Sequence, residues 1–344
     1  MEPDPGVDQS LAELGELAVL ARLRAFCAPQ VGDDAYIQQL PPEKSLVVTT
    51  DVLVDGVHFS DRTMPPHALG WRAVAANLSD LAAMGAAPLG ITVAAALPSD
   101  TQWRWLEGVY QGMQACLGRY GGDIIGGDLA RSGVRSLAIT ALGAVSPSAA
   151  IYRHTAQPEQ AIVATGRHGA ARAGLALLLG ELDCKNIEAD LCQDWIAAHQ
   201  YPTPRFDAIA QLRQLAHTEF PNLDNFAGMD SSDGLANAVM QLCRASGVGA
   251  KLVRSRLPLP PGLSQAIGQA QAEDWTLYGG EDFELVMCLP TQIAEALVAR
   301  LGGSSAVIGQ TTTAPRVLLV KDLATRDGET LSCEREFQHF EHTS

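Results

Sequence analysis

The sequence predicts a two-domain protein of the α/β class. Strand-like apolar runs alternate with helix-like segments along nearly the whole chain, a pattern typical of strands and helices packed in layers. A chain of 344 residues with 47% hydrophobic content also exceeds the usual size of a single domain. The stretch 146–160 is polar and contains two prolines, which favours a connection there. We therefore expect domains at residues 1–148 and 149–344.

The first half of the chain is expected to contain four strands and two helices. A strand is expected at 46–54, where an apolar run is interrupted by polar residues. Pro66 fits the first turn of a helix, where its missing N–H is not needed, so a helix is expected from there to about residue 84. Ser99 and Gln102 form a capping-box pattern, which predicts a second helix reaching about residue 119. The remaining strands are expected at 90–97, 123–125 and 137–145.

The second half continues the same alternation of strand and helix patterns. The segment 201–204 holds two prolines and separates two of the expected helices. Strands are expected at 161–165, just after Phe226, and at 283–289, 306–308 and 317–320. Helices are expected at 170–179, 187–199 and 292–301. One further helix is expected to run through Leu215, and another, after the motif at 229–234, to about Ala245.

The composition argues against several classes of protein. The first nine residues are acidic and contain proline, unlike a secretory signal, and the most apolar window, 88–98, is about half as long as a membrane helix. Seven scattered cysteines without a CxxC pair favour free thiols in a reducing cytoplasm. A net charge of −15 repels phosphate backbones, which argues against nucleic acid as a partner.

Acidic residues stand next to glycine or other small residues at several expected element ends. Because Asp and Gly are common in turns, each motif alone is also consistent with an ordinary turn. Asp80 differs, since it lies inside an apolar helix one turn after Asn77, where a carboxylate needs either solvent or a partner. The aspartates singled out in this way are Asp34, Asp51, Asp80, Asp128, Asp230 and Asp233.

Carboxylates that converge need a counter-charge, and the available donors are nearly all hard oxygens. This selects magnesium, manganese or calcium over zinc, and several such ions suit a polyphosphate ligand. The chain nevertheless lacks the GxxxxGK[ST] loop, and residues 281–284 (EDFE) resemble the kinase DFG motif only superficially. If ATP binds, its phosphates must be met by metal ions, by Arg131 and Arg153, and by N–H groups such as those after Asp233.

An ordered set of motifs resembles the thiamine-monophosphate kinase family, part of the wider superfamily that includes aminoimidazole ribonucleotide synthetase. The portion from Val31 to Pro98 is the most specific. The motifs are VGDDAYI, TTDVLVDGVHF, NLSDLAAMGAAPLGITVAAALP, GGDLARSG, YPTPRFDAIAQL, MDSSDGLANAV and LYGGEDFELV.

The resemblance implies a two-domain aminoimidazole ribonucleotide synthetase-like fold whose N-terminal β-sheet forms a homodimer interface. It implies the last step of thiamine diphosphate biosynthesis, in which ATP phosphorylates thiamine phosphate with several Mg²⁺ ions per site. The implied metal ligands are Asp34, Thr49, Thr50, Asp51, Asp80, Asp128, Asp230 and Asp233. The implied ATP contacts are Tyr110, Gly127, Asp128, Arg153 and Ser232, and the implied substrate contacts are His58, Glu281 and Phe337.

The acceptor in such a reaction is itself a phosphate, so no general base is expected. Asp51, Asp80, Asp128 and Asp233 would support direct in-line transfer as metal ligands. Two alternatives remain open at this point. One is another ATP-using member of the superfamily acting on a carbonyl or a selenide, although Cys27 lacks the Gly-rich context of the selenide branch. The other is a noncatalytic protein that binds metal and nucleotide.

The sequence departs from the family pattern at two places. Residues 166–171 read GRHGAA where the family shows a Gly-Asp pair, and Ser231 stands where an aliphatic residue is usual. Both departures leave the aspartates intact, so they bear on local contacts more than on the reaction.

Overall fold

The computed structural model describes residues 8–220 and 226–332, which form two compact units. Unit 1 comprises the described residues up to Leu81 together with Ala86–Ser148. Unit 2 comprises Ala82–Gly85 and the described residues from Ala149 onward.

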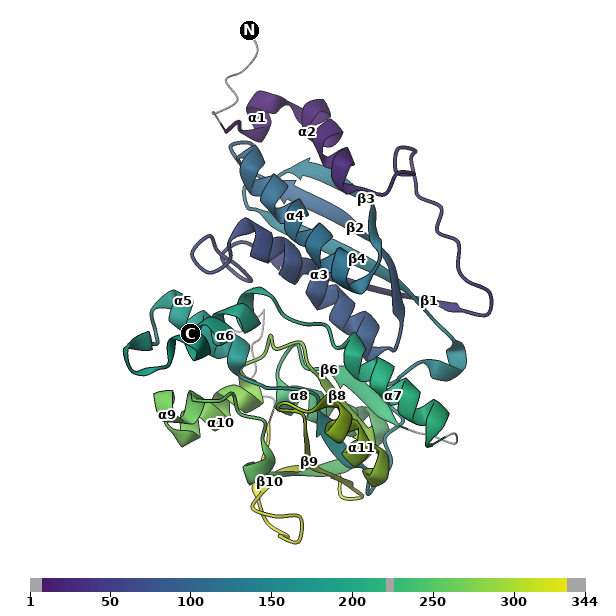
Figure 1. Cartoon of the computed structure of the whole chain (residues 1–344), viewed down its shortest axis with the longest axis vertical. Coiled ribbons are helices and arrows are strands. Elements are labelled where there is room, and N and C mark those ends of the chain that lie inside the picture. The colour runs from purple at the N-terminus through teal and green to yellow at the C-terminus, as the bar shows by residue number, and fades with distance from the viewer. Residues whose placement is uncertain (1–7, 221–225, 333–344) are drawn as a thin grey trace. The chain divides into compact units, whose positions relative to one another are not determined.

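Unit 1 is built on a four-stranded sheet with helices α3 and α4 against one face (Figure 1). Along β1, Leu53 is buried on that face, whereas Val48 and Val52 on the other face are more than half exposed. The strands, in sheet order, are β1 (Ser45–Val54), β4 (Ser136–Val145), β2 (Ala87–Leu97) and β3 (Asp123–Arg131). The helices are α1 (Leu11–Leu14), α2 (Glu16–Leu23), α3 (Pro66–Ala83) and α4 (Trp103–Tyr120).

The start of α4 corrects the capping-box prediction. The helix begins at Trp103, and Gln102 at its N-cap makes no side-chain cap. Instead, the N–H of Trp103 donates to the carbonyl of Gln9 at 2.8 Å, and the N–H of Arg104 donates to the carboxylate of Asp8 at 3.1 Å. A segment distant in sequence thus satisfies the first donors of the helix.

Unit 2 has a seven-stranded sheet with a hydrophobic core on each face. In the inner strand β5, Ile162 packs into a core with α8, whereas Val163 packs into a core with α7 and α11. The strand order is β11 (Glu329–Thr330), β10 (Val317–Val320), β7 (Gly249–Val253), β9 (Ala306–Thr312), β5 (Ala161–Ala164), β8 (Leu285–Leu289) and β6 (Ala227–Asp230). The helices are α5 (Ala170–Leu179), α6 (Ala189–Gln200), α7 (Phe206–Thr218), α8 (Leu235–Ser246), α9 (Leu263–Ile267), α10 (Gln269–Tyr278) and α11 (Thr291–Leu301).

Several elements of unit 2 differ from the sequence-based expectation. The strand expected from residue 283 starts only at Leu285, because Phe283 has a positive φ of 51° that does not fit a strand. The strands β7 and β11 and the helices α9 and α10 were not expected. Short 3₁₀ helices also occur at Arg24–Phe26, Pro147–Ala149, Cys184–Asn186 and Arg254–Arg256.

Cys184 and Cys192 form a disulfide, so the expectation of free thiols is wrong for this pair, although Cys27, Cys116, Cys243 and Cys288 are free. The spacing of eight residues carries no CxxC signal, which is why the pairing could not be read from the sequence.

Among the described residues, no helix has both the length and the apolar character needed to cross a membrane.

Candidate functional site

Asp80 and Thr49 are brought together in unit 1 from α3 and β1. The hydroxyl of Thr49 donates to Oδ2 of Asp80 at 2.5 Å, and both residues are half-buried. Asp80 also lies in the last turn of α3, which has no basic residue there. Because the negative end of the helix dipole disfavours a carboxylate at that position, a bound cation would relieve an unfavourable charge.

Asn77, which was not predicted to be a site residue from the sequence, adds a side-chain oxygen. It lies one turn before Asp80 on the same helix face and is fully buried. Its Nδ2 donates to the carbonyl of Ala73 at 3.0 Å, whereas its Oδ1 has no hydrogen-bond partner among the described residues. A buried carbonyl oxygen without a partner is costly, and a cation or its bound water would satisfy it. Hard oxygens of Asp80, Thr49 and Asn77 therefore fit magnesium.

The other carboxylates of unit 1 are spread across the sheet. Asp51 pairs with Ile139, which pairs with Val93 and then Gly127, so Asp51 and Gly127 occupy one row on the two outer strands. Three strand spacings separate them, about 14 Å along the sheet. Asp128 follows Gly127 in the next row. The described part of the chain contains no group of three or more His, Cys, Asp or Glu side chains that could hold a metal by itself.

The remaining sites expected in unit 1 have varied surroundings. Asp34 is exposed in the loop before β1, and the hydroxyl of Thr50 donates to the carbonyl of Ile139 at 3.0 Å. The N–H of Val54 donates to Nδ1 of His58 at 3.1 Å. Nδ1 is therefore the acceptor, and a neutral His58 ring carries its proton on Nε2.

Tyr110, expected to contact ATP, is a buried residue of α4. Its ring lies 5.7 Å from that of Phe26, centroid to centroid, and only 5% of the residue is exposed. Burial raises the pKa of its hydroxyl. The structure gives Tyr110 a packing role, and its contact with ATP remains a prediction.

In unit 2, the end of β6 presents a short acidic turn. Asp230 and Ser231 are buried, Asp233 is exposed, and the hydroxyl of Ser232 donates to Oδ1 of Asp230 at 3.3 Å. Gly234 then adopts a positive φ of 112° and leads directly into α8. The turn thus places Asp233 and the first N–H groups of α8 at one end of the helix, where anions are favoured.

A strained segment packs beside this turn. Glu281 has a positive φ of 63°, as Phe283 does in the same segment, and its N–H donates to the carbonyl of Ser232 at 2.6 Å. Backbone strain of this kind is common at functional sites. The carboxylate of Glu281 also lies 3.6 Å from Nδ1 of His199, a buried residue of α6 that sequence reasoning did not identify.

Asp282 links the strained segment to α5. Its carboxylate accepts from the N–H groups of Gly169 at 2.6 Å and Ala171 at 2.9 Å, so it caps the helix from a distant part of the chain. Burial raises its pKa to about 7, although these two donors favour the ionised form. The EDFE motif was noted in the sequence, but its capping role depends on a long-range contact.

A buried ion pair anchors the same segment. Glu284 is paired with Arg205, and the hydroxyl of Thr165 donates to Glu284 at 2.6 Å. Burial raises the pKa of Glu284, and the charge of Arg205 partly offsets this. A Cβ on Gly166 would lie 2.1 Å from the Glu284 carboxylate, so a larger residue there would displace Glu284 from its present contacts.

Arg153 and Phe337 are the remaining contacts expected from the sequence. Arg153 is exposed and donates to Oε1 of Gln241 at 2.9 Å. Phe337 lies outside the described residues.

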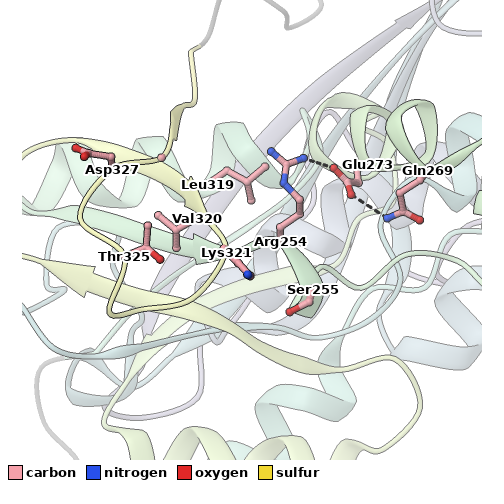
Figure 2. A pocket seen from close by; sticks show the side chains of 10 residues that line it. Arg254, Ser255, Gln269, Glu273, Leu319, Val320, Lys321, Thr325 and Asp327 are labelled. Atoms are coloured by element: carbon pink, nitrogen blue, oxygen red, sulfur yellow. Dashed lines mark hydrogen bonds and ion pairs between the residues drawn. The ribbon is translucent and has the colours of Figure 1, made fainter.

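A pocket of about 600 Å³ in unit 2 contains none of the expected site residues. Figure 2 shows Arg254 paired with Glu273 and Gln269 donating to the same carboxylate within it. Because none of the residues singled out from the sequence lines it, this pocket is separate from the candidate site.

Comparisons with known proteins agree with the motifs in the sequence. The model of the AIR synthase related protein N-terminal domain matches residues 32–145. A thiamine-monophosphate kinase from Synechococcus elongatus is 53% identical over 336 residues, covering 97% of this chain and 98% of the relative.

Solved structures give the same likeness. A crystal structure of thiamine-monophosphate kinase from Stenotrophomonas maltophilia K279a has a TM-score of 0.77 at 31% identity and covers 94% of this chain and 99% of its own. A structure of AaThiL complexed with AMPPCP and TMP has a TM-score of 0.72 at 26% identity, covering 96% and 99%. The expected α/β fold of the aminoimidazole ribonucleotide synthetase type is confirmed.

Proposed function

Because the chain belongs to the thiamine-monophosphate kinase family, we propose how its residues take part in the reaction of that family. The protein is a kinase that phosphorylates thiamine phosphate to thiamine diphosphate with ATP. The near full-length identity to the relative from Synechococcus elongatus is the observation that carries this function. The complex with AMPPCP and TMP in a similar structure agrees with the two substrates.

The transfer itself needs no general base. The phosphate of the acceptor has a second pKa of about 6 and is largely dianionic at pH 7. One of its oxygens attacks the γ-phosphorus of ATP while the bond to the β,γ-bridging oxygen breaks, which releases thiamine diphosphate and ADP. Magnesium ions, when bound, neutralise charge on the phosphates. The protein's own task is to hold two anionic substrates in line.

The proposed metal ligands are the acidic and hydroxyl residues singled out from the sequence. Thr49 and Asp80 are the pair supported by a direct contact, and Asn77 adds an oxygen beside them. Asp51, Asp80, Asp128 and Asp233 are assigned to the transfer centre. The remaining ligands are Asp34, Thr49, Thr50 and Asp230, and several ions per site are proposed.

The proposed contacts to the organic groups are fewer. Glu281 and His58 orient thiamine phosphate. The positive φ of Glu281, a strained backbone conformation, supports its role. Phe337 is assigned to the cationic heterocycle, where cation–π contact contributes about 0.5–2 kcal/mol. ATP is assigned to Tyr110, Gly127, Asp128, Arg153 and Ser232. Residues 1–148 then form the ATP- and metal-binding domain, and 149–344 form the C-terminal domain.

A coupled assay tests the function directly. Purified protein supplied with thiamine phosphate, ATP and magnesium is expected to form thiamine diphosphate and ADP in equal amounts. Chromatography of the products measures both. ATP hydrolysis without thiamine diphosphate would favour another ATP-using member of the superfamily, and nucleotide binding without turnover would favour a noncatalytic role. We also propose that the protein works in the cytoplasm, where ATP is available.

A homodimer is proposed through the open face of the unit 1 sheet. Leu46, Val48 and Val52 alternate along β1 on this face and are 45%, 57% and 51% exposed. An apolar row of this kind is typical of a surface covered by a partner. Val48→Glu is therefore expected to convert dimer to monomer in sedimentation equilibrium. Leu17→Glu, at an 84% exposed position on α2, is the matched control, and an unchanged mass for both variants would contradict this interface.

A further inference from the structure

The two places where the sequence departs from the family pattern contact each other in unit 2. Nε2 of His168 lies 3.0 Å from the hydroxyl of Ser231, although 63 positions separate the two residues. His168 is 0% exposed and Ser231 is 1% exposed. The departures are therefore one buried polar pair and not two independent surface changes.

The imidazole of His168 is fixed on both sides. Nδ1 lies 3.2 Å from the carbonyl of Gly166, and because a carbonyl can only accept, Nδ1 carries the proton. Burial lowers the pKa of His168 to about 4, so the ring is neutral and its Nε2 is an acceptor. The hydroxyl of Ser231 therefore has two acceptors within reach, Nε2 of His168 at 3.0 Å and the carbonyl of Glu284 at 3.2 Å, and its one proton is shared between them.

Ser231 is in turn held by its backbone. Its N–H donates to the carbonyl of Glu284 at 2.9 Å, and its carbonyl accepts from the N–H of Gly234 at 3.0 Å. The side-chain bond to His168 adds a third fixed point to a residue that stands directly between Asp230 and Ser232. The pair is thus one of the contacts that hold the turn carrying Asp230 and Asp233.

We propose that His168 is a positioning residue which, through Ser231, orients Asp230 and Asp233 for the metal ions that accompany ATP. The inference rests on the proposed function, since it assigns these aspartates to the metal site. His168 itself touches neither substrate nor metal. Partners that orient metal ligands contribute about 10–100-fold to metal affinity or activity.

A set of variants tests the pair by kinetics and by metal binding. His168→Leu and Ser231→Ala are each expected to raise the KM for magnesium ATP about tenfold and to weaken Mn²⁺ binding to a similar degree. The KM for thiamine phosphate is expected to stay unchanged. His168→Gln keeps a group that can accept from Ser231 and is expected to restore most of the lost affinity. The double variant H168L/S231A is expected to be no worse than either single variant.

Thr311→Val is the matched control, because Thr311 is a buried and hydrogen-bonded residue of β9 outside the proposed site. It is expected to lower the thermal midpoint without changing the KM for magnesium ATP. If His168→Leu behaves in the same way, with Mn²⁺ affinity unchanged, the pair only fills the core and the inference is overturned. Mn²⁺ titration by electron paramagnetic resonance needs no turnover. If the unchanged protein showed no kinase activity, the proposed function would be refuted. Weaker Mn²⁺ binding by His168→Leu than by that unchanged protein would still support the positioning role.

Discussion

Replacing Asp80 with Asn is expected to lower the turnover of thiamine phosphate by about 100-fold or more, even at saturating magnesium. The amide keeps the size of the side chain and can still accept from Thr49, but it removes the charge that balances a cation. Stability is expected to stay the same or rise slightly, because the negative end of α3 disfavours the carboxylate when no ion is present. Steady-state kinetics and thermal unfolding measure the two effects separately.

Asp123→Asn is the control for this experiment. Asp123 is an exposed acid at the start of β3 in the same unit, so its removal changes the net charge equally. Its turnover is expected to match that of the unchanged protein. An Asp80→Asn variant with normal turnover at saturating magnesium would show that Asp80 is not a metal ligand.

Arg205→Met is expected to lower the free energy of unfolding by about 3–5 kcal/mol, because it leaves Glu284 buried without a counter-charge. Arg205 is 9% exposed, and it also donates to the carboxylate of Asp207 at 2.9 Å. Urea unfolding followed by circular dichroism measures the loss. Because the pKa of Glu284 is already raised, the variant is expected to take up a proton there on folding and to lose further stability as the pH rises.

Arg300→Met supplies the matched comparison. Arg300 pairs with Glu219, and their side chains are 29% and 49% exposed, so neither charge is buried. Pairs in such exposed positions contribute about 0–1 kcal/mol. Equal losses for the two variants would mean that burial does not set the contribution of the Arg205 pair.

The sequence was most informative where local pattern decides the structure. A proline at the first turn predicted the start of α3, which begins at Pro66. The capping pattern at Ser99 failed because Gln9 and Asp8 satisfy the start of α4 from a distance. A local motif cannot show which remote segment will supply a hydrogen-bond acceptor.

In the candidate site, too, local features could be predicted from the sequence and long-range contacts could not. The acidic turns could be marked from residue type and spacing, and Asp80 from its apolar surroundings. The partners that hold them could not, because His199, Asp282 and the His168–Ser231 pair depend on contacts between distant segments. The carbonyl oxygen of Asn77 became notable only once the structure showed it buried without a partner.

The pairing of the strands also sets an order in which the protein can fold during synthesis. In unit 1, β1 pairs along its whole length with β4, so the sheet can close once Val145 has left the ribosome. In unit 2, the wholly buried β5 is made early but pairs only with β8 and β9, which end at Leu289 and Thr312. Pairing over such long sequence separations is slow and leaves apolar strands exposed meanwhile. The nascent chain therefore carries an unprotected β5 for most of the time in which its second half is translated, and chaperone demand should concentrate in that interval.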